Sequence, residues 1–290
     1  MKVIRSIQDM KQLMRDYRTQ NKQIGFVPTM GFLHEGHLNL MREAKKENDV
    51  VAASIFINPL QFGPNEDYEN YPRDEQADVL QAEKAGVDVL FIPTVADMYP
   101  NPMLIQLGIK GRTDVLCGRS RPGHFDGVLT VLTKLFHIIS PDKVYFGLKD
   151  AQQTAVVDAL IDDLNFPIEL VGLPTVRETD GLAKSSRNVN LTEQERGEAV
   201  WLYKGLQHGR QLIRRGEQNP DKIIHDVTET MNHHISGNID YVELLSYPAL
   251  EPVSSINQRI ILAAAVYFER ARLIDNLLLD KSGEIITRYS

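Results

Sequence analysis

Apolar residues in the first two thirds of the chain gather in short continuous runs, separated by longer stretches of helical spacing. A continuous apolar run is typical of a strand buried on both faces, whereas apolar positions three and four apart are typical of a helix packed on one face. The strands predicted in this way are at 24–27, 49–57, 87–93, 142–146 and 168–176, with a weaker one at 104–109. The helices predicted around them are at 4–18, 38–46, 73–85, 128–139 and 151–164.

This alternation of strand and helix predicts an α/β fold with a doubly wound, Rossmann-like parallel sheet. The pattern changes after Asn190, where Thr192 and Glu195 form a capping box for a long helix. A second helix at 221–234 follows, with strands at 239–246, 260–268 and 271–278. We therefore predict a Rossmann-like domain at 1–187 and a smaller α+β C-terminal domain at 188–290.

Composition and charge narrow the possible functions. The chain has 290 residues, a formal net charge of -7 and a pI near 5.6, which argues against a broad nucleic-acid-binding surface. No apolar run is long enough to span a membrane, and the N-terminus lacks the apolar core of a signal peptide. The single cysteine, Cys117, cannot form an internal disulfide, so we expect a packing role for it and a cytoplasmic location.

Candidate chemistry begins in the predicted strand-to-helix turn at 28–37, whose sequence is PTMGFLHEGH. Gly31 allows a sharp turn, which is expected to aim unpaired backbone N–H groups and the positive helix end at a ligand such as phosphate. His34 and His37 are three residues apart, so on a helix they share one face and can donate to the same phosphate oxygen. Gly36 lacks a side chain and leaves room for a ribose or a nucleobase.

Two other interpretations of the histidine pair remain open. Histidines at this spacing are often surface residues or helix caps. A zinc site is a second alternative, although the turn lacks the H-E-x-x-H spacing because Glu35 directly follows His34.

A second polar turn follows the predicted strand at 142–146. Lys149 could neutralise phosphate charge, and Asp150 could hold a magnesium ion directly or through water, although an N-cap is the alternative for Asp150. Gln153 would point from the first helical turn towards the same ligand. Because parallel strands end at a common edge, both polar turns should lie at one side of the sheet.

Polar residues in three further loops are candidates for ligand contacts. Asn58 and Gln61 follow the predicted strand at 49–57, with ordinary turn chemistry as the alternative for each. Residues 184–187 carry Lys, Ser, Ser and Arg, which could clamp a triphosphate or be a solvated loop. The arginines of 119–127 could meet an anion or be solvated, and His124 among them is at most an outer residue of a site.

Five motifs in this order resemble the pantothenate synthetase (pantoate–β-alanine ligase) family, of the class I aminoacyl-tRNA-synthetase-like nucleotidyltransferases. They are PTMGxLHEGH from Pro28, FINPxQF from Phe56, GHFxGV from Gly123, FGxKDxQQ from Phe146 and KSSRN from Lys184. The resemblance runs nearly from end to end, and the last hundred residues match in character more than in motif.

The resemblance implies ligation in two steps. Pantoate carboxylate attacks the α-phosphate of ATP to give pantoyl adenylate and pyrophosphate, and the amine of β-alanine then displaces AMP to give pantothenate. It also implies a need for Mg²⁺, a C-terminal lid domain and a homodimer formed through the N-terminal domain.

Site roles follow by the same resemblance. The catalytic residues are His34, His37 and Lys149, Asp150 is the metal-binding residue, and Gln61 and Gln153 bind pantoate or β-alanine. The ATP-binding residues are Met30, Gly31, Phe32, Leu33, His34, Glu35, Gly36, His37, Gly147, Leu148, Lys149, Asp150, Val176, Lys184, Ser185, Ser186 and Arg187.

Three other functions compete with this one. An adenylyltransferase would need extra cations for an acceptor phosphate, whereas the loop at 58–62 is neutral. An RNA-binding relative of a tRNA synthetase would be expected to carry a basic C-terminal domain, which this chain lacks. A non-catalytic nucleotide sensor would have no use for the two histidines together with Lys149 and Asp150.

Overall fold

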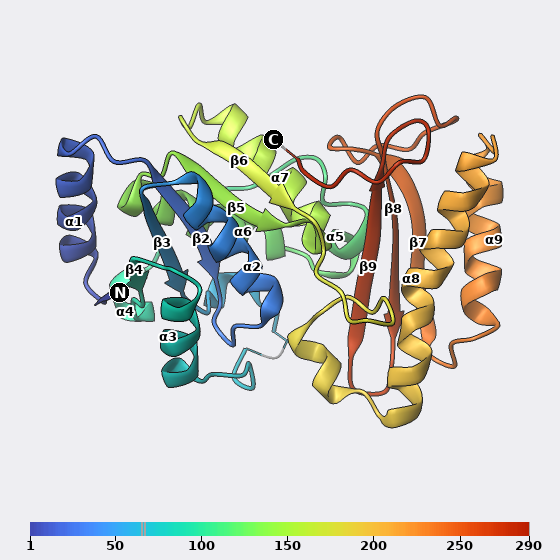
Figure 1. Ribbon diagram of the computed structural model, residues 1–290, viewed down its shortest axis with the longest axis horizontal. Helices are drawn as coiled ribbons and strands as arrows, with labels where there is room; N and C mark the ends of the chain where they lie inside the picture. The colour runs from blue at the N-terminus through green and yellow to red at the C-terminus, as the bar shows by residue number, and fades with distance from the viewer. Residues whose placement is uncertain (65, 67, 290) are drawn as a thin grey trace.

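The computed structural model describes residues 1–64, 66 and 68–289 (Figure 1). Strands between residues 2 and 173 form a six-stranded sheet in the order β1-β4-β3-β2-β5-β6, and every neighbouring pair is parallel. The strands are β1 (Lys2–Ile4), β2 (Ile24–Thr29), β3 (Val50–Ile55), β4 (Val89–Phe91), β5 (Lys143–Gly147) and β6 (Glu169–Leu173). The predicted parallel α/β sheet is confirmed.

Helices cover both faces of this sheet (Figure 1). Successive strand residues point to opposite faces, so both faces must be apolar. Phe26 accordingly packs into the core under α1, α6 and α7, and Val27 packs into the core under α2 and α3. The helices are α1 (Ile7–Thr19), α2 (Glu35–Glu47), α3 (Glu75–Lys84), α4 (Val95–Met98), α5 (Leu116–Ser120), α6 (His124–Ile139) and α7 (Ala151–Asp163).

A second, antiparallel sheet follows in the order β7-β8-β9 and packs against α8 and α9. Its elements are α8 (Glu193–Arg214), α9 (Pro220–Asn232), β7 (Asn238–Ser246), β8 (Ile260–Tyr267) and β9 (Arg272–Leu279). The edge strand β9 lies towards the first sheet (Figure 1). The division after residue 187 stays a prediction, and the core under α6 and α7 also contains Leu245, Tyr247 and Leu278.

The outer edge of β6 is covered by a segment much later in the chain. Gly172 and Tyr289 form an antiparallel bridge, with N···O distances of 2.7 Å and 3.0 Å between their backbones. The neighbouring Arg288 makes an ion pair of 2.7 Å with Glu47 of α2. This bridge occupies part of a strand edge that could otherwise pair with another chain.

Several predicted boundaries need correction. The first helix begins at Ile7 instead of residue 4, because residues 2–4 form β1. Its predicted entry through Ser6 is confirmed, since Ser6 Oγ accepts the Asp9 N–H at 3.1 Å. Helix α6 begins at His124, four residues before its predicted start. The short helices α4 and α5 were not predicted.

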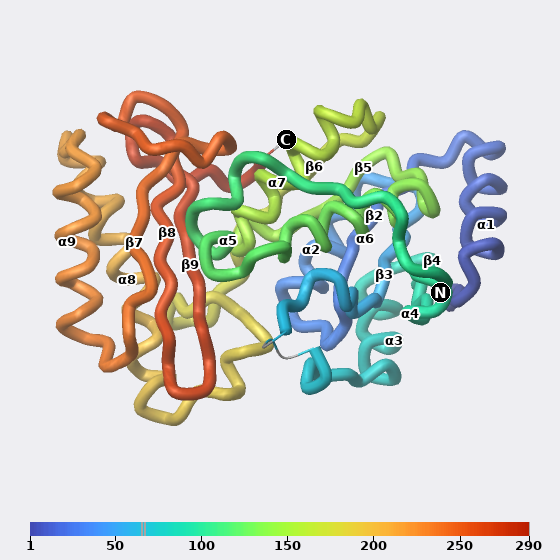
Figure 2. Tube along the Cα trace, turned by 180° about the vertical axis from the view of Figure 1, so that it is seen from behind, coloured from blue at the N-terminus to red at the C-terminus, as the bar shows by residue number. Residues whose placement is uncertain are grey.

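The strand predicted at 104–109 is wrong. These residues have no regular structure, and Leu104 and Ile105 are 100% and 72% exposed. Figure 2 shows the segment between α4 and α5 crossing the back of the molecule to reach the side of β9. The apolar spacing that suggested a strand therefore belongs to an extended segment without a partner strand within the described part of the chain.

Candidate active site

The two polar turns predicted from the sequence lie at the point where the strand order reverses. The chain runs outward from β2 to β3 and β4, then returns to β5 on the other side of β2. The turn after β2 carries His34, and the turn after β5 carries Lys149. Because β2 and β5 are paired in parallel, both turns leave the same edge of the sheet, which is where open α/β sheets bind ligands.

The turn after β2 is held by acceptors from the protein itself. Gly31 has a φ of +83°, and its N–H donates to Thr29 Oγ1 at 3.2 Å. The N–H groups of Phe32 and Leu33 donate to the two carboxylate oxygens of Asp78 at 2.8 Å and 2.7 Å. These N–H groups are therefore not the unpaired phosphate donors expected from the sequence. Their acceptor, Asp78 on α3, is only 2% exposed and was not predicted.

The two histidines lie at the N-terminus of α2 and share its capping interactions. His34 is the N-cap, and its Nδ1 accepts the Gly36 N–H at 3.1 Å, so the cap interpretation holds for this residue. His37 Nδ1 accepts the His34 N–H at 3.4 Å. A Cβ at Gly36 would lie 2.8 Å from His34 Cε1, so the glycine gives room to the imidazole of His34.

These hydrogen bonds fix the tautomers of both rings. With each Nδ1 acting as an acceptor, the proton of the neutral imidazole sits on Nε2. Burial, followed by the positive charge of Lys149, lowers the pKa of His34 to about 4. Burial and the neighbouring His34 lower the pKa of His37 to about 3. Both rings are thus neutral N–H donors at physiological pH, which suits hydrogen bonding to phosphate oxygens better than proton transfer from an imidazolium.

We expect neither ring to titrate between about pH 8 and about pH 5, in contrast to a free histidine with a pKa of about 6.5. Below about pH 6.5 the histidines of the unfolded chain bind protons, whereas these two folded rings stay neutral. The pair therefore lowers the free energy of unfolding as the pH falls from about 6.5 towards 4. Nitrogen NMR of labelled histidine, assigned with single substitutions, measures both tautomer and titration. A midpoint near 6.5 for either ring would contradict this prediction.

Lys149 and Asp150 lie in a short 3-10 turn at Leu148–Asp150 between β5 and α7. Lys149 Nζ is 4.0 Å from an Asp150 carboxylate oxygen, and the Asp150 side chain is 54% exposed. Asp150 occupies the N-cap position of α7, as the alternative predicted, but its side chain makes no capping hydrogen bond. Besides this contact with Lys149, the exposed carboxylate can meet a cation, and the charges of both residues act on His34.

The loop predicted to clamp a triphosphate is anchored where it begins. Arg177 pairs with Ala183 in an isolated β-bridge, and the Lys184 N–H donates to the Val176 carbonyl at 2.9 Å. Lys184 Nζ lies 3.3 Å from Glu178, and Ser185 Oγ accepts the Arg187 N–H at 3.3 Å. Because the charge of Lys184 also acts on His34, this loop and the β2 turn lie near each other.

Gln61 is buried next to the β2 turn. Its Nε2 donates to Met30 Sδ at 3.0 Å, and its Oε1 accepts from Asn58 Nδ2 at 3.2 Å. Asn58 also accepts the Leu60 N–H, so turn chemistry is the correct interpretation of Asn58. His124 Nδ1 contacts the Gln61 backbone oxygen at 2.8 Å, which gives His124 a role in supporting Gln61.

A cavity of about 720 Å³ lies between the start of α7 and the strands β8 and β9. Candidate residues that line it are Lys149, Asp150, Gln153, Ser185 and Arg187. The two histidines, Gln61 and Lys184 do not line this cavity. The structure thus brings one group of candidates around the cavity and a second group, with the histidines, around the β2 turn.

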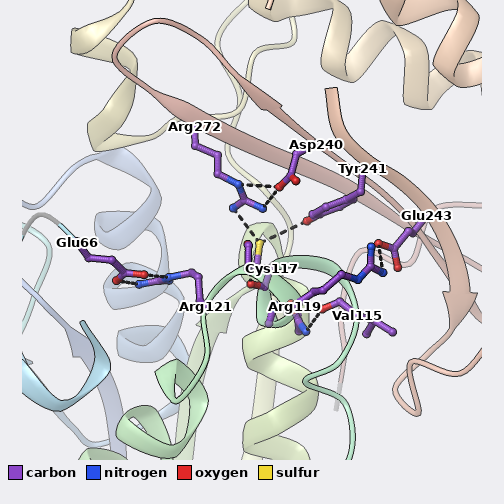
Figure 3. Close-up of polar contacts among 12 residues, drawn as sticks. Glu66, Val115, Cys117, Arg119, Arg121, Asp240, Tyr241, Glu243 and Arg272 are labelled. Carbon is purple, nitrogen blue, oxygen red and sulfur yellow. Dashed lines mark hydrogen bonds and ion pairs between the residues drawn. The ribbon is translucent and has the colours of Figure 1, made fainter. Parts of the chain in front are cut away.

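Figure 3 shows two groups of polar side chains that line the cavity, one of Glu66 with Arg121 and one of Cys117 with Tyr241 and Arg272. Cys117 Sγ lies 3.4 Å from Tyr241 Oη and 3.4 Å from Arg272 Nη1, so its surroundings are more polar than the predicted packing role implies. Arg121, one of the predicted anion-binding arginines, instead pairs with Glu66 at 2.6 Å.

Comparisons with known proteins point to one family. The family model for pantoate-beta-alanine ligase matches residues 2–278. Pantothenate synthetase from Geobacillus sp. (strain WCH70) is 58% identical over 278 residues, covering 96% of this chain and 99% of that protein. The protein of the same name from Bacillus subtilis (strain 168) is 57% identical over 283 residues, covering 97% and 98%.

Solved structures agree. Pantothenate synthetase from Thermus thermophilus superimposes with a TM-score of 0.90 at 41% identity, covering 96% of this chain and 99% of that one. Pantoate-beta-alanine ligase from Francisella tularensis, complexed with beta-gamma ATP and beta-alanine, has a TM-score of 0.76 at 36% identity, covering 96% and 97%.

Proposed function

The chain belongs to the pantoate–β-alanine ligase family, whose members join pantoate and β-alanine at the expense of ATP, and we propose that it does so through a pantoyl-adenylate intermediate. Pantoate carboxylate attacks the α-phosphorus of ATP and pyrophosphate leaves. The free amine of β-alanine then attacks the activated carbonyl, loses a proton and displaces AMP, giving pantothenate.

One observation carries this assignment. At the edge where β2 and β5 end, the neutral imidazoles of His34 and His37, with their Nε2–H groups, both lie within the electrostatic influence of Lys149, and Lys184 also acts on His34. In the proposed reaction, His34, His37 and Lys149 stabilise negative charge that builds on the transferred phosphate. The loop from Lys184 to Arg187 holds the remaining phosphates, and the Val176 backbone contacts the nucleotide.

Pantoate is a hydroxy acid, so its site should offer neutral hydrogen-bonding groups. Gln153 lines the cavity next to Lys149, and Gln61 lies beside Met30 of the β2 turn. We assign pantoate to the space between these two amides. With this assignment, the carboxylate of pantoate lies between the phosphate-handling residues and the cavity. β-Alanine would then reach the activated carbonyl from the cavity.

Magnesium fits the site as a companion of ATP. No group of three or more His, Cys, Asp or Glu side chains in the described ranges could hold a metal ion. Asp150, with its exposed carboxylate, would therefore be one ligand, and phosphate oxygens and water would complete the octahedral shell that Mg²⁺ prefers. The ion would neutralise phosphate charge during displacement.

Exchange of labelled pyrophosphate into ATP tests the two-step route. With pantoate and magnesium but no β-alanine, we expect label to enter ATP, because adenylate formation is reversible on the enzyme. Leaving out pantoate, or chelating magnesium, should abolish the exchange. If label enters ATP only once β-alanine is added, a concerted condensation must replace the adenylate.

We further propose a cytoplasmic homodimer formed through the N-terminal domain. Leu104 and Ile105 are highly exposed for aliphatic side chains, and a second copy of the chain would cover them. Among the described residues, none of the helices has the length and apolar character needed to cross a bilayer. Light scattering measures the molar mass in solution. A molar mass equal to that of one chain, in both the natural protein and the Leu104→Glu variant, would contradict the dimer.

A further inference from the structure

Two adjacent polar residues of β9, Asp275 and Asn276, are buried where the second sheet meets the turns of the first. They are 3% and 8% exposed. Buried polar side chains are costly unless they are hydrogen bonded, so their partners reveal what they hold in place. Both sets of partners belong to segments that carry proposed phosphate-handling residues.

Asn276 holds the Lys149 turn. Its Nδ2 group donates to the backbone oxygens of Leu148 and Lys149, at 3.0 Å and 2.8 Å. Both carbonyls belong to the 3-10 turn between β5 and α7. One amide group from another sheet thus fixes the backbone from which the Lys149 side chain projects.

Asp275 holds the segment that leads to Lys184. Its two carboxylate oxygens accept from the Arg177 guanidinium at 2.6 Å and 2.9 Å. The same guanidinium donates to the Gly181 backbone oxygen at 3.0 Å and lies 3.8 Å above the Tyr203 ring. Since Arg177 and Ala183 are bridged, fixing Arg177 also fixes the backbone next to Lys184.

We propose that β9 sets the spacing between Lys149 and Lys184, with Asn276 and Asp275 as positioning residues for adenylate formation. Adjacent residues of one strand cannot move independently, and the Asn276 N–H donates to Asp275 at 2.8 Å. The second sheet therefore supports the phosphate site and also forms a wall of the cavity. This inference rests on the proposed role of Lys149.

Asn276→Ala tests the inference through pyrophosphate exchange. We expect the maximal exchange rate to fall at least about tenfold, since displacement of a catalytic group by about 1 Å can cost a hundredfold. The KM for pantoate should stay within about twofold, because the pantoate amides are on other elements. Asn257→Ala, an exposed asparagine in the same part of the chain, is the control and should leave exchange unchanged.

A double-mutant cycle separates positioning from a merely structural role. If Asn276 acts through Lys149, Asn276→Ala should cost little more once Lys149 is already alanine. Independent losses that multiply, or full exchange in Asn276→Ala, would overturn the positioning role. Full exchange in Lys149→Ala would overturn the proposed role of Lys149 and the inference together. Should Asn276→Ala not fold, Asn276→Ser, which keeps one donor, replaces it in the cycle.

Discussion

Replacing His37 with alanine is expected to slow adenylate formation about a hundredfold, because removing one preorganised donor to transition-state charge costs on the order of 3 kcal/mol. The Nδ1 of His37 is occupied by the His34 N–H, so its Nε2–H is the group available to a phosphate oxygen. Pantoate binding should change little, since the ring lies outside the cavity wall that carries Gln153.

Single-turnover measurement of AMP transfer to pantoate reads this step directly. His225→Ala, an exposed histidine on α9, is the matched control and should keep the normal rate. A near-normal single turnover in His37→Ala would remove His37 from the chemistry. Because the ring is neutral throughout, His37→Ala should lose the same factor in rate at pH values on either side of the ordinary histidine pKa.

Replacing Gly127 with alanine should damage pantoate binding by displacing Gln61. Gly127 lies in the first turns of α6, and a Cβ there would lie 2.2 Å from the Leu60 backbone oxygen and 2.6 Å from the Gln61 nitrogen. Backbone atoms cannot swing away as the end of a side chain can. We expect the KM for pantoate to rise at least about tenfold and stability to fall by about 1–3 kcal/mol, as in other overpacked sites.

The matched control is Gly197→Ala in α8, where an added Cβ would have no neighbour within 4 Å. Alanine is favoured over glycine in a helix by about 0.5–1 kcal/mol, so this change should stabilise the protein slightly and leave the KM for pantoate unchanged. Chemical denaturation and steady-state kinetics measure the two effects. An unchanged pantoate KM in a folded Gly127→Ala variant would mean that Gln61 does not contact pantoate.

The features that the sequence predicted well are local or follow from topology. Continuous apolar runs identify strands buried on both faces, and the resulting alternation with helices implies a parallel sheet. Once the sheet is parallel, the turns carrying His34 and Lys149 must leave the same edge. Their convergence at the switch point between β2 and β5 could therefore be predicted from the sequence.

The features that the sequence missed depend on contacts between distant segments. Asp78 is one acid among several on α3, and its local sequence does not indicate that it accepts two N–H groups from the β2 turn. Asn276 gives no local indication of its two partners before α7. A polar residue at an inward position of an otherwise apolar strand or helix does indicate a buried polar group. The local sequence does not indicate which residue is its hydrogen-bond partner.

Secondary-structure errors have the same origin. Strand β1 has three residues, too few for a periodic pattern, and exists because β4 offers it an edge. Residues 104–109 have the apolar spacing of a strand but no strand to pair with in the described chain. Local preference permits extension in both segments, and pairing decides whether a strand results.

The pairing of Tyr289 with Gly172 bears on how the chain folds as a ribosome makes it. All six strands of the first sheet are synthesised long before Tyr289 emerges, so the outer edge of β6 lacks this pairing partner during most of translation. An unpaired strand edge on a partly folded chain promotes association with other chains. The need for a chaperone should thus be greatest late in translation, when every proposed catalytic residue has already been made.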